Sequence, residues 1–168
     1  MKKCAIDALS TFIGSFAESE VKDNPPFAAV LALVKGNTKG LKQSNINLNK
    51  SIFDLLLCIF KTLSSLKVSS DIWICKVTIP VVIDKISDRK LGSCSHSVLT
   101  CLCEIKKPET VLSLAIEAIT DVKSPLSHEA FLKWTLTLCE DFGAASLGSG
   151  VHNLTTWTIK VCVYSKVD

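Results

Sequence analysis

The chain has 168 residues, of which 48% are apolar and 21% charged. Its length is typical of one domain, and this apolar content excludes an intrinsically disordered chain. Aromatic residues make up only 7% and there are 7 glycines, which argues against a turn-rich β-barrel, so we expect one compact domain over residues 1–168.

The charge argues against a nucleic-acid-binding domain. There are 19 basic and 16 acidic residues, a formal net charge of +3, and all the basic residues except Arg89 are lysines. Arginine is the residue that usually reads base edges and holds phosphates with two hydrogen bonds. We therefore expect no nucleic-acid partner.

The sequence also predicts no membrane partner. No apolar run approaches the roughly twenty residues needed to cross a bilayer, and Asp7 interrupts the first segment where a signal peptide would be apolar. We expect a cytoplasmic protein whose 8 cysteines stay reduced and serve as small apolar core residues.

Apolar residues recur every three or four positions along almost the whole chain, which predicts amphipathic helices. Prolines and glycines mark the ends: Pro108 and Pro125 begin helices, and Gly143 follows one. The β-branched stretch at 78–83 contains Pro80, which a central strand would not accept, so we expect a kinked helix there. The expected helices cover residues 2–19, 25–35, 46–66, 70–86, 91–105, 108–122, 126–142 and 150–165, with no sheet.

The turns between these helices alternate in charge. If the helices form antiparallel pairs, the turns at 37–46, 87–91 and 123–126 share one edge, and each carries basic residues, whereas the opposite edge is balanced. Three repeat units separate Lys42 from Lys166, which gives about 41 residues for each unit. This length is typical of the helical pairs in HEAT and armadillo solenoids. The alternative is that these lysines are ordinary solvated loop residues and that the excess of basic residues on one edge arose by chance. The run 35–50, with four lysines and no acid, suits an acidic protein surface.

No group of residues predicts chemistry. Cys94, His96, Cys101 and Cys103 contain zinc-ligand types, but a Cys-x-Cys pair in a helix points its thiols apart and no Cys-x-x-Cys occurs. Ser93 and Cys94 near His96 lack an orienting carboxylate. We expect no enzyme activity, no catalytic residue, no metal and no cofactor. His128 and His152 are expected in solvent, and three tryptophans in the core: Trp73, Trp134 and Trp157.

Five short segments occur in an order and at separations that are typical of one family. They are Lys39–Leu48 (KGLKQSNINL), Ile83–Lys90 (IDKISDRK), Lys123–Pro125 (KSP), Phe131–Trp134 (FLKW) and Glu140–Gly143 (EDFG). Together they resemble a TOG domain, the HEAT-repeat, tubulin-binding module of microtubule polymerases and CLASP proteins. The similarity is greatest to an internal TOG domain of the third type.

The resemblance implies an all-α solenoid, a paddle of about four HEAT-like helical pairs whose turns bind αβ-tubulin or microtubules. It also implies sister TOG domains in the same longer chain, and a cytoskeletal role in microtubule polymerisation, plus-end dynamics and spindle organisation. The implied tubulin-binding residues are Lys42, Asn45, Asn47, Arg89, Lys90, Lys123 and Ser124.

The chain departs from the family pattern in several places. It resembles a partial domain, without the first contact turn and most of the fifth, and Leu41 stands where the family often has tryptophan. Asn45, Asn47 and Ser124 are also typical of helix caps and turns. The alternative function is a HEAT-repeat spacer or protein-protein adaptor that does not bind tubulin.

Overall fold

The computed structural model describes residues 11, 36, 41, 45–65 and 72–164, and these form an all-α fold with no strand among them. The predicted helices at 2–19 and 25–35 lie outside this part of the chain, as does Lys42. No described helix has both the length and the apolar character needed to cross a bilayer. The helices are α4 (Ile46–Ser65), α5 (Ile72–Ile83), α6 (Gly92–Ile105), α7 (Pro108–Thr120), α8 (Pro125–Phe142), the short 3₁₀ helix η1 (Ala144–Leu147) and α9 (Gly150–Tyr164).

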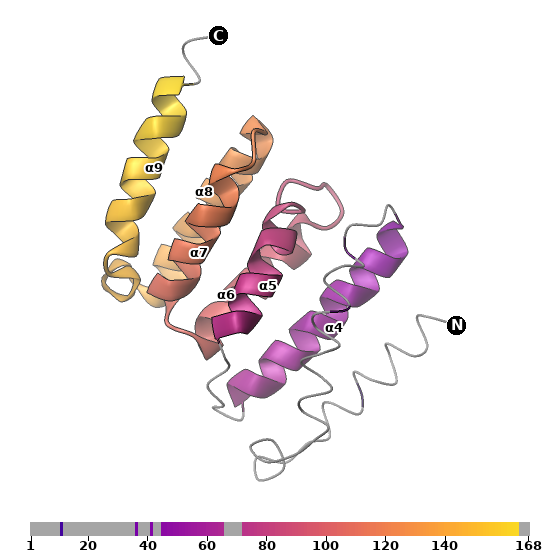
Figure 1. The fold of residues 1–168 in the computed structure, drawn as a ribbon. Helices are drawn as coiled ribbons and strands as arrows, with labels where there is room; N and C mark the ends of the chain where they lie inside the picture. Colours follow the sequence, from indigo (N-terminus) through magenta and orange to yellow (C-terminus); the bar gives the residue numbers. More distant parts are fainter. Residues whose placement is uncertain (1–10, 12–35, 37–40, 42–44, 66–71, 165–168) are drawn as a thin grey trace.

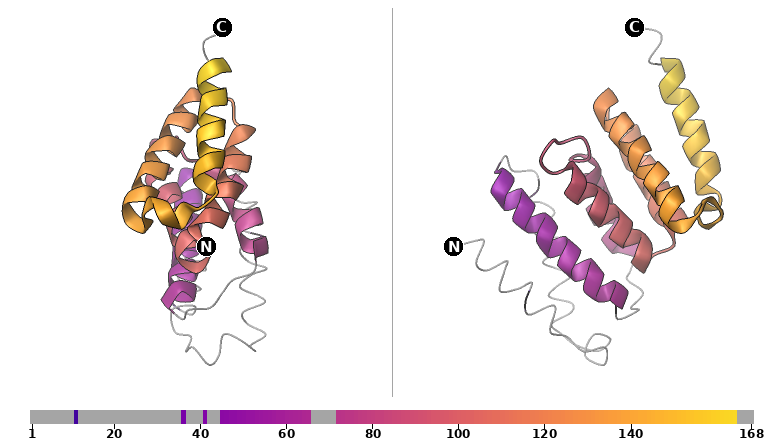
Figure 2. Two further views of the ribbon diagram at one scale, coloured as in Figure 1. Left: turned by 90° about the vertical axis from the view of Figure 1, so that its left-hand side faces the viewer. Right: turned by 180° about the vertical axis from the view of Figure 1, so that it is seen from behind.

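The helices form two layers, and consecutive helices run in opposite directions (Figures 1 and 2). One layer contains α4, α6 and α8, and the other contains α5, α7 and α9. Within the layers α4 packs against α6, α5 against α7, and α7 against α9. Each described helix therefore contacts the helix two places along the chain, as expected for stacked helical pairs.

This alternation brings every second connection to the same edge of the molecule. The start of α4, the connection Asp84–Leu91 and the turn Asp121–Ser124 lie at the upper edge in Figure 1. The connection from α6 to α7 and the segment from α8 to α9 lie at the opposite edge. The expectation that the turns near 46, 87–91 and 123–126 share an edge is confirmed for their described residues.

The core is built from the predicted apolar stripes. In α4, Ile52, Leu55, Ile59 and Leu63 are buried, and Leu48 is half-buried. Each fully buried leucine or isoleucine contributes about 1.5–3 kcal/mol through removal of apolar surface from water. The remaining predicted stripes are also buried or packed against the core: Val111, Ala115, Ile119 and Val122 in and after α7, and Phe131, Trp134, Leu138 and Phe142 in α8.

The tryptophan and cysteine predictions are mostly confirmed. Trp134 and Trp157 are buried, and Trp73 is half-buried against the core. Most of the described cysteines are buried or half-buried. Cys162 is exposed on α9, so its assignment to the core was wrong. The periodicity of α9 did not show this because its outward face is apolar too, with Ile159 and Val163 more than half exposed.

Helix α5 ends three residues earlier than predicted. It runs through Pro80 to Ile83, and the chain then makes i to i+3 hydrogen bonds from Lys85 N to Val82 O and from Ile86 N to Ile83 O. These tighter bonds bring Ile86 back against the start of α6, where both Ile86 and Leu91 are buried. The connection is thus a folded loop anchored by two apolar side chains.

The close approach of this loop to α6 explains the glycine at position 92. A Cβ atom on Gly92 would lie 2.8 Å from the carbonyl oxygen of Ile86, closer than side-chain carbons normally come to a backbone atom. Because both ends of the loop are fixed by buried side chains, the backbone has little freedom to move away.

Replacing Gly92 with alanine should therefore lower the free energy of unfolding by about 1–3 kcal/mol, the usual cost of forcing an extra carbon into a filled site. Urea unfolding followed by circular dichroism measures the change. Ser93→Ala, at the neighbouring exposed position, is the matched control and should have little effect. A Gly92→Ala protein as stable as the wild type would show that the loop can move.

Candidate functional site

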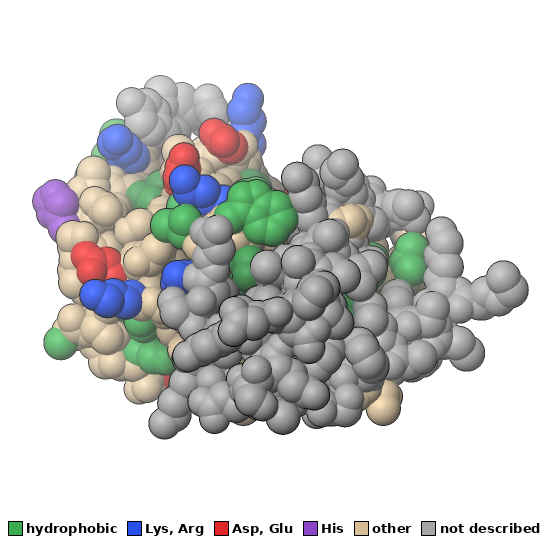
Figure 3. Space-filling model, turned by 60° about the horizontal axis from the view of Figure 1, so that its bottom comes forward, with side chains coloured by type: hydrophobic (Ala, Val, Ile, Leu, Met, Phe, Trp, Pro, Cys, Tyr) green, Lys and Arg blue, Asp and Glu red, His purple; other side chains and the backbone are tan. Residues whose placement is uncertain are grey.

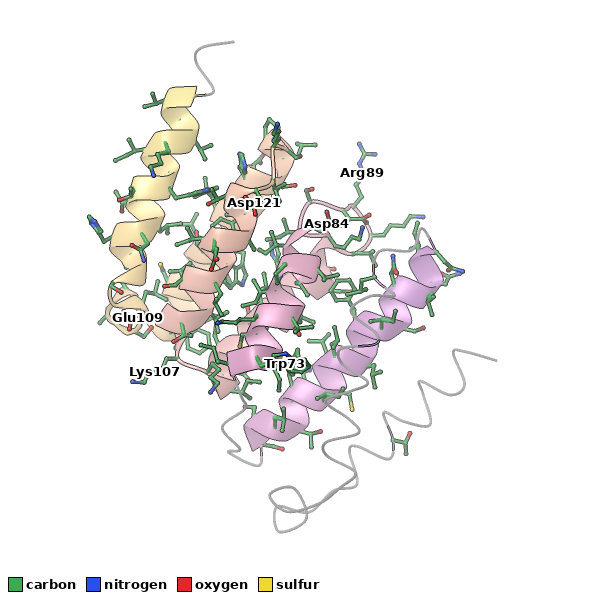
Figure 4. The ribbon with its side chains drawn as sticks, viewed as in Figure 1. Trp73, Asp84, Arg89, Lys107, Glu109 and Asp121 are labelled. Atoms are coloured by element: carbon green, nitrogen blue, oxygen red, sulfur yellow. The ribbon has the colours of Figure 1, made fainter. Side chains whose placement is uncertain are left out.

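The described site residues lie along one edge of the molecule, which we call the loop edge and define as Asn45–Asn47, Asp84–Leu91 and Asp121–Ser124 (Figure 1). Arg89, Lys90 and Lys123 are exposed there, and the side chain of Arg89 points away from the body of the protein (Figure 4). Asn45 and Asn47 are exposed at the start of α4, and Ser124 is half-exposed before α8. Six of the seven predicted residues are thus brought to one edge.

The loop that carries Arg89 and Lys90 is held by Asp88. Its Oδ1 accepts hydrogen bonds from the backbone N–H groups of Lys90 at 2.8 Å and Leu91 at 3.0 Å, and its carbonyl accepts one from Gly92 at 2.8 Å. An aspartate that closes a turn in this way fixes the backbone at the helix start. The two basic side chains therefore leave a defined backbone and extend into solvent.

The turn that carries Lys123 is held from α8. Ser124 Oγ accepts a hydrogen bond from Ser127 N at 3.4 Å, which caps the helix, and His128 Nε2 donates to the carbonyl of Val122 at 2.6 Å. The His128 ring also lies edge-on to Trp157, with ring centroids 5.4 Å apart. His128 is half-buried rather than solvated as expected, because it connects this turn to the core.

The two loops are joined to each other. Ser87 Oγ and Ser127 Oγ lie 2.9 Å apart and share a hydrogen bond, although they are 40 residues apart in the chain. Ser127, in the first turn of α8, is buried and Ser87 is half-buried, so this bond is partly shielded from water. The hydrogen bond fixes the position of the Arg89 loop relative to the turn that presents Lys123. Sequence patterns could not have predicted it, since both serines are also ordinary loop and helix-start residues.

Two of the predicted polar contact residues serve as helix caps. Asn45 Oδ1 accepts a hydrogen bond from Leu48 N at 3.1 Å at the start of α4, as Ser124 does for α8. The alternative role expected for these two residues is therefore present. Leu41, at the position where the family often has tryptophan, is fully buried and belongs to the core.

The loop edge is less uniformly basic than the sequence analysis implied. Exposed Asp84, Asp88 and Asp121 lie among its basic residues, and Lys85 forms an ion pair with Asp84 at 3.0 Å. These acids are present in the sequence of the same turns, but the predicted basic edge was based on the lysines and Arg89 alone. Much of the positive potential expected on this edge is therefore cancelled locally.

Where the structure describes it, the opposite edge carries mixed charges, as predicted: Lys106 and Lys107 lie between Glu104 and Glu109 in the chain. Figure 3 shows basic and acidic side chains close together on this side of the protein. Glu109, at the start of α7, accepts hydrogen bonds from the backbone N–H of Ser149 at 2.9 Å and from its hydroxyl, and these bonds lower the pKa of the carboxyl. Glu109 thereby ties the segment before α9 to α7, a structural role.

The described residues contain no group of three or more histidine, cysteine or acidic side chains arranged to hold a metal ion. Cys101 and Cys103 are buried, and burial is the largest cause that raises the pKa of each thiol. Raised pKa values keep both sulfurs protonated at neutral pH, so neither is activated as a nucleophile or a ligand. His96 Nε2 is buried without a hydrogen-bond partner, and burial lowers the pKa of this imidazole.

Comparison of the chain with protein-family models, with curated proteins and with solved structures gives no match. The resemblance to a TOG domain therefore depends on the five sequence segments described above.

The buried imidazole of His96 predicts a pH dependence of stability. Since its folded pKa is below the ordinary value of 6.5, the unfolded chain takes up a proton first on acidification. The contribution to stability is complete above pH 6.5 and is lost as the pH falls from there to the folded pKa. Urea unfolding of the wild type and of His96→Gln at a series of pH values measures it.

The wild type should lose more stability than His96→Gln over this range. His152→Gln removes an exposed histidine and should keep the wild-type dependence. Equal pH dependence in the wild type and in His96→Gln would contradict the prediction.

Proposed function

We propose that this chain is a TOG-type HEAT-repeat module that binds αβ-tubulin through its loop edge. The observation that supports the proposal is the fixed presentation of Arg89, Lys90 and Lys123 on one edge by loops that are joined through Ser87 and Ser127. The role in microtubule polymerisation, plus-end dynamics and spindle organisation, and the cytoplasmic location with sister TOG domains, come from the sequence resemblance.

The electrostatics of the partner make the contact reasonable. Tubulin is acidic, so spaced cations on a rigid edge can meet several of its carboxylates together. Exposed ion pairs contribute about 0.2–1 kcal/mol each and act mainly on association rate and orientation. Because the loops are already fixed by Asp88, Ser124 and His128, little conformational entropy would be lost when they bind. Lys42, which the resemblance also implies as a contact, lies outside the described residues.

Charge reversal of the loop edge is the direct test. Arg89→Glu/Lys90→Glu/Lys123→Glu should weaken binding to unpolymerised tubulin about tenfold or more, because three attractive charges become repulsive. Binding is measured by co-elution in size-exclusion chromatography and by titration, and the wild-type affinity should fall with salt.

The matched control reverses three exposed lysines away from the loop edge: Lys61→Glu/Lys76→Glu/Lys107→Glu. This variant has the same change in net charge and should bind as the wild type does. Both variants should melt within a few degrees of the wild type. Equal tubulin affinity in the two variants would remove the site assignment, and no co-elution of the wild type would reject the function.

The acids on the loop edge favour a second function, a HEAT-repeat spacer or protein-protein adaptor that does not bind tubulin. Asp84, Asp88 and Asp121 stand next to the cations that would meet tubulin, and Asp84 already pairs with Lys85. Such a mixed surface attracts an acidic partner less strongly than a purely basic one. The same co-elution experiment distinguishes the two functions.

A further inference from the structure

A groove of about 550 Å³ lies between α5 and α7, on the layer that faces the viewer in Figures 1 and 4, and it reaches the loop edge at Asp84, Asp121 and Val122. Its floor contains the buried side chains Cys75 and Ile79. Its walls contain Leu114, Ala118 and Val122, which are only half-buried. Apolar surface is thus left partly open to solvent between two neighbouring helices.

Carboxylates surround this apolar groove. Asp84, Glu117 and Asp121 line it together with a single cation, Lys76, and Figure 4 shows Asp84 and Asp121 at the upper ends of their helices. Asp84 is paired with Lys85, but in the described part of the chain Glu117 and Asp121 form no ion pair. Three carboxylates stand against Lys76 in the groove and Lys85 beside Asp84, so the rim has a net negative charge.

We propose that the α5–α7 groove binds a basic amphipathic helix of a partner protein. Its apolar side chains would cover Leu114, Ala118 and Val122, and its lysines or arginines would meet Glu117 and Asp121. The groove runs between two helices of one layer, which suits an added helix whose contacts recur every three or four residues. An acidic ligand such as nucleic acid would be repelled by the same carboxylates.

A phage-displayed library of random peptides, long enough for several helical turns, is selected on the full chain, and the most enriched sequence is synthesised as the probe. Selected sequences should carry Lys or Arg beside apolar residues at helical spacing. Glu117→Lys/Asp121→Lys should weaken the Kd of the peptide about tenfold, because two favourable rim charges become repulsive. Ala118→Trp, which fills the groove, should abolish binding.

Glu140→Lys/Asp141→Lys, at the exposed end of α8 in the other layer, is the control with the same charge change and should bind normally. If Glu117→Lys/Asp121→Lys lowers the melting temperature, Glu117→Gln/Asp121→Asn is used in its place. This neutral variant should weaken peptide binding by a smaller factor. The Arg89→Glu/Lys90→Glu variant changes no residue that lines the groove and should bind the peptide as the wild type does while binding tubulin less tightly, so this proposal and the tubulin proposal fail separately.

Three results would overturn the proposal. The first is selection of acidic or uncharged peptides. The second is a selected peptide whose affinity is unchanged by both Ala118→Trp and Glu117→Lys/Asp121→Lys. The third is self-association of the wild-type chain, seen by sedimentation and lost in Glu117→Lys/Asp121→Lys, which would assign the groove to a second copy of this chain.

Discussion

The packing of each helix against the helix two places along the chain determines the rest of this structure. The connections are short: two residues join α6 to α7, and four join α7 to α8. A short connection forces neighbouring helices to run in opposite directions, so every second connection returns to the same edge. The loop edge and the α5–α7 groove both follow from this arrangement, the first from the loops and the second from two helices side by side in one layer.

The loops of the loop edge are held from within the protein. Asp88 closes one turn and Ser124 caps the helix after the other, while His128 connects the Val122 carbonyl to the ring of Trp157. The bond between Ser87 and Ser127 then joins the two loops. Because these contacts reach buried side chains, loss of core packing near Trp157 would also displace the turn that carries Lys123. The stability of the core and the geometry of this edge are therefore coupled.

Sequence patterns predicted the helices well where one apolar face was clear and where proline marked the start. Helices α7 and α8 begin at Pro108 and Pro125, as expected, and the predicted stripe of α4 is buried along most of its length. The end of α5, the position of His128 and the Ser87–Ser127 bond were missed. Each depends on neighbours that the fold brings together from distant parts of the chain, which a local pattern cannot contain.

Pro80 shows how one residue can have a consequence that secondary-structure analysis overlooks. In the sequence it served to exclude a strand, and α5 tolerates it because the helix is held by contacts with α6 and α7. Its missing N–H removes one bond of the helical ladder, so α5 depends on these neighbours more than a regular helix would. The way in which α5 meets α7 also leaves Leu114, Ala118 and Val122 half-buried and Glu117 exposed beside them, and the groove therefore follows from the packing of two helices within one layer.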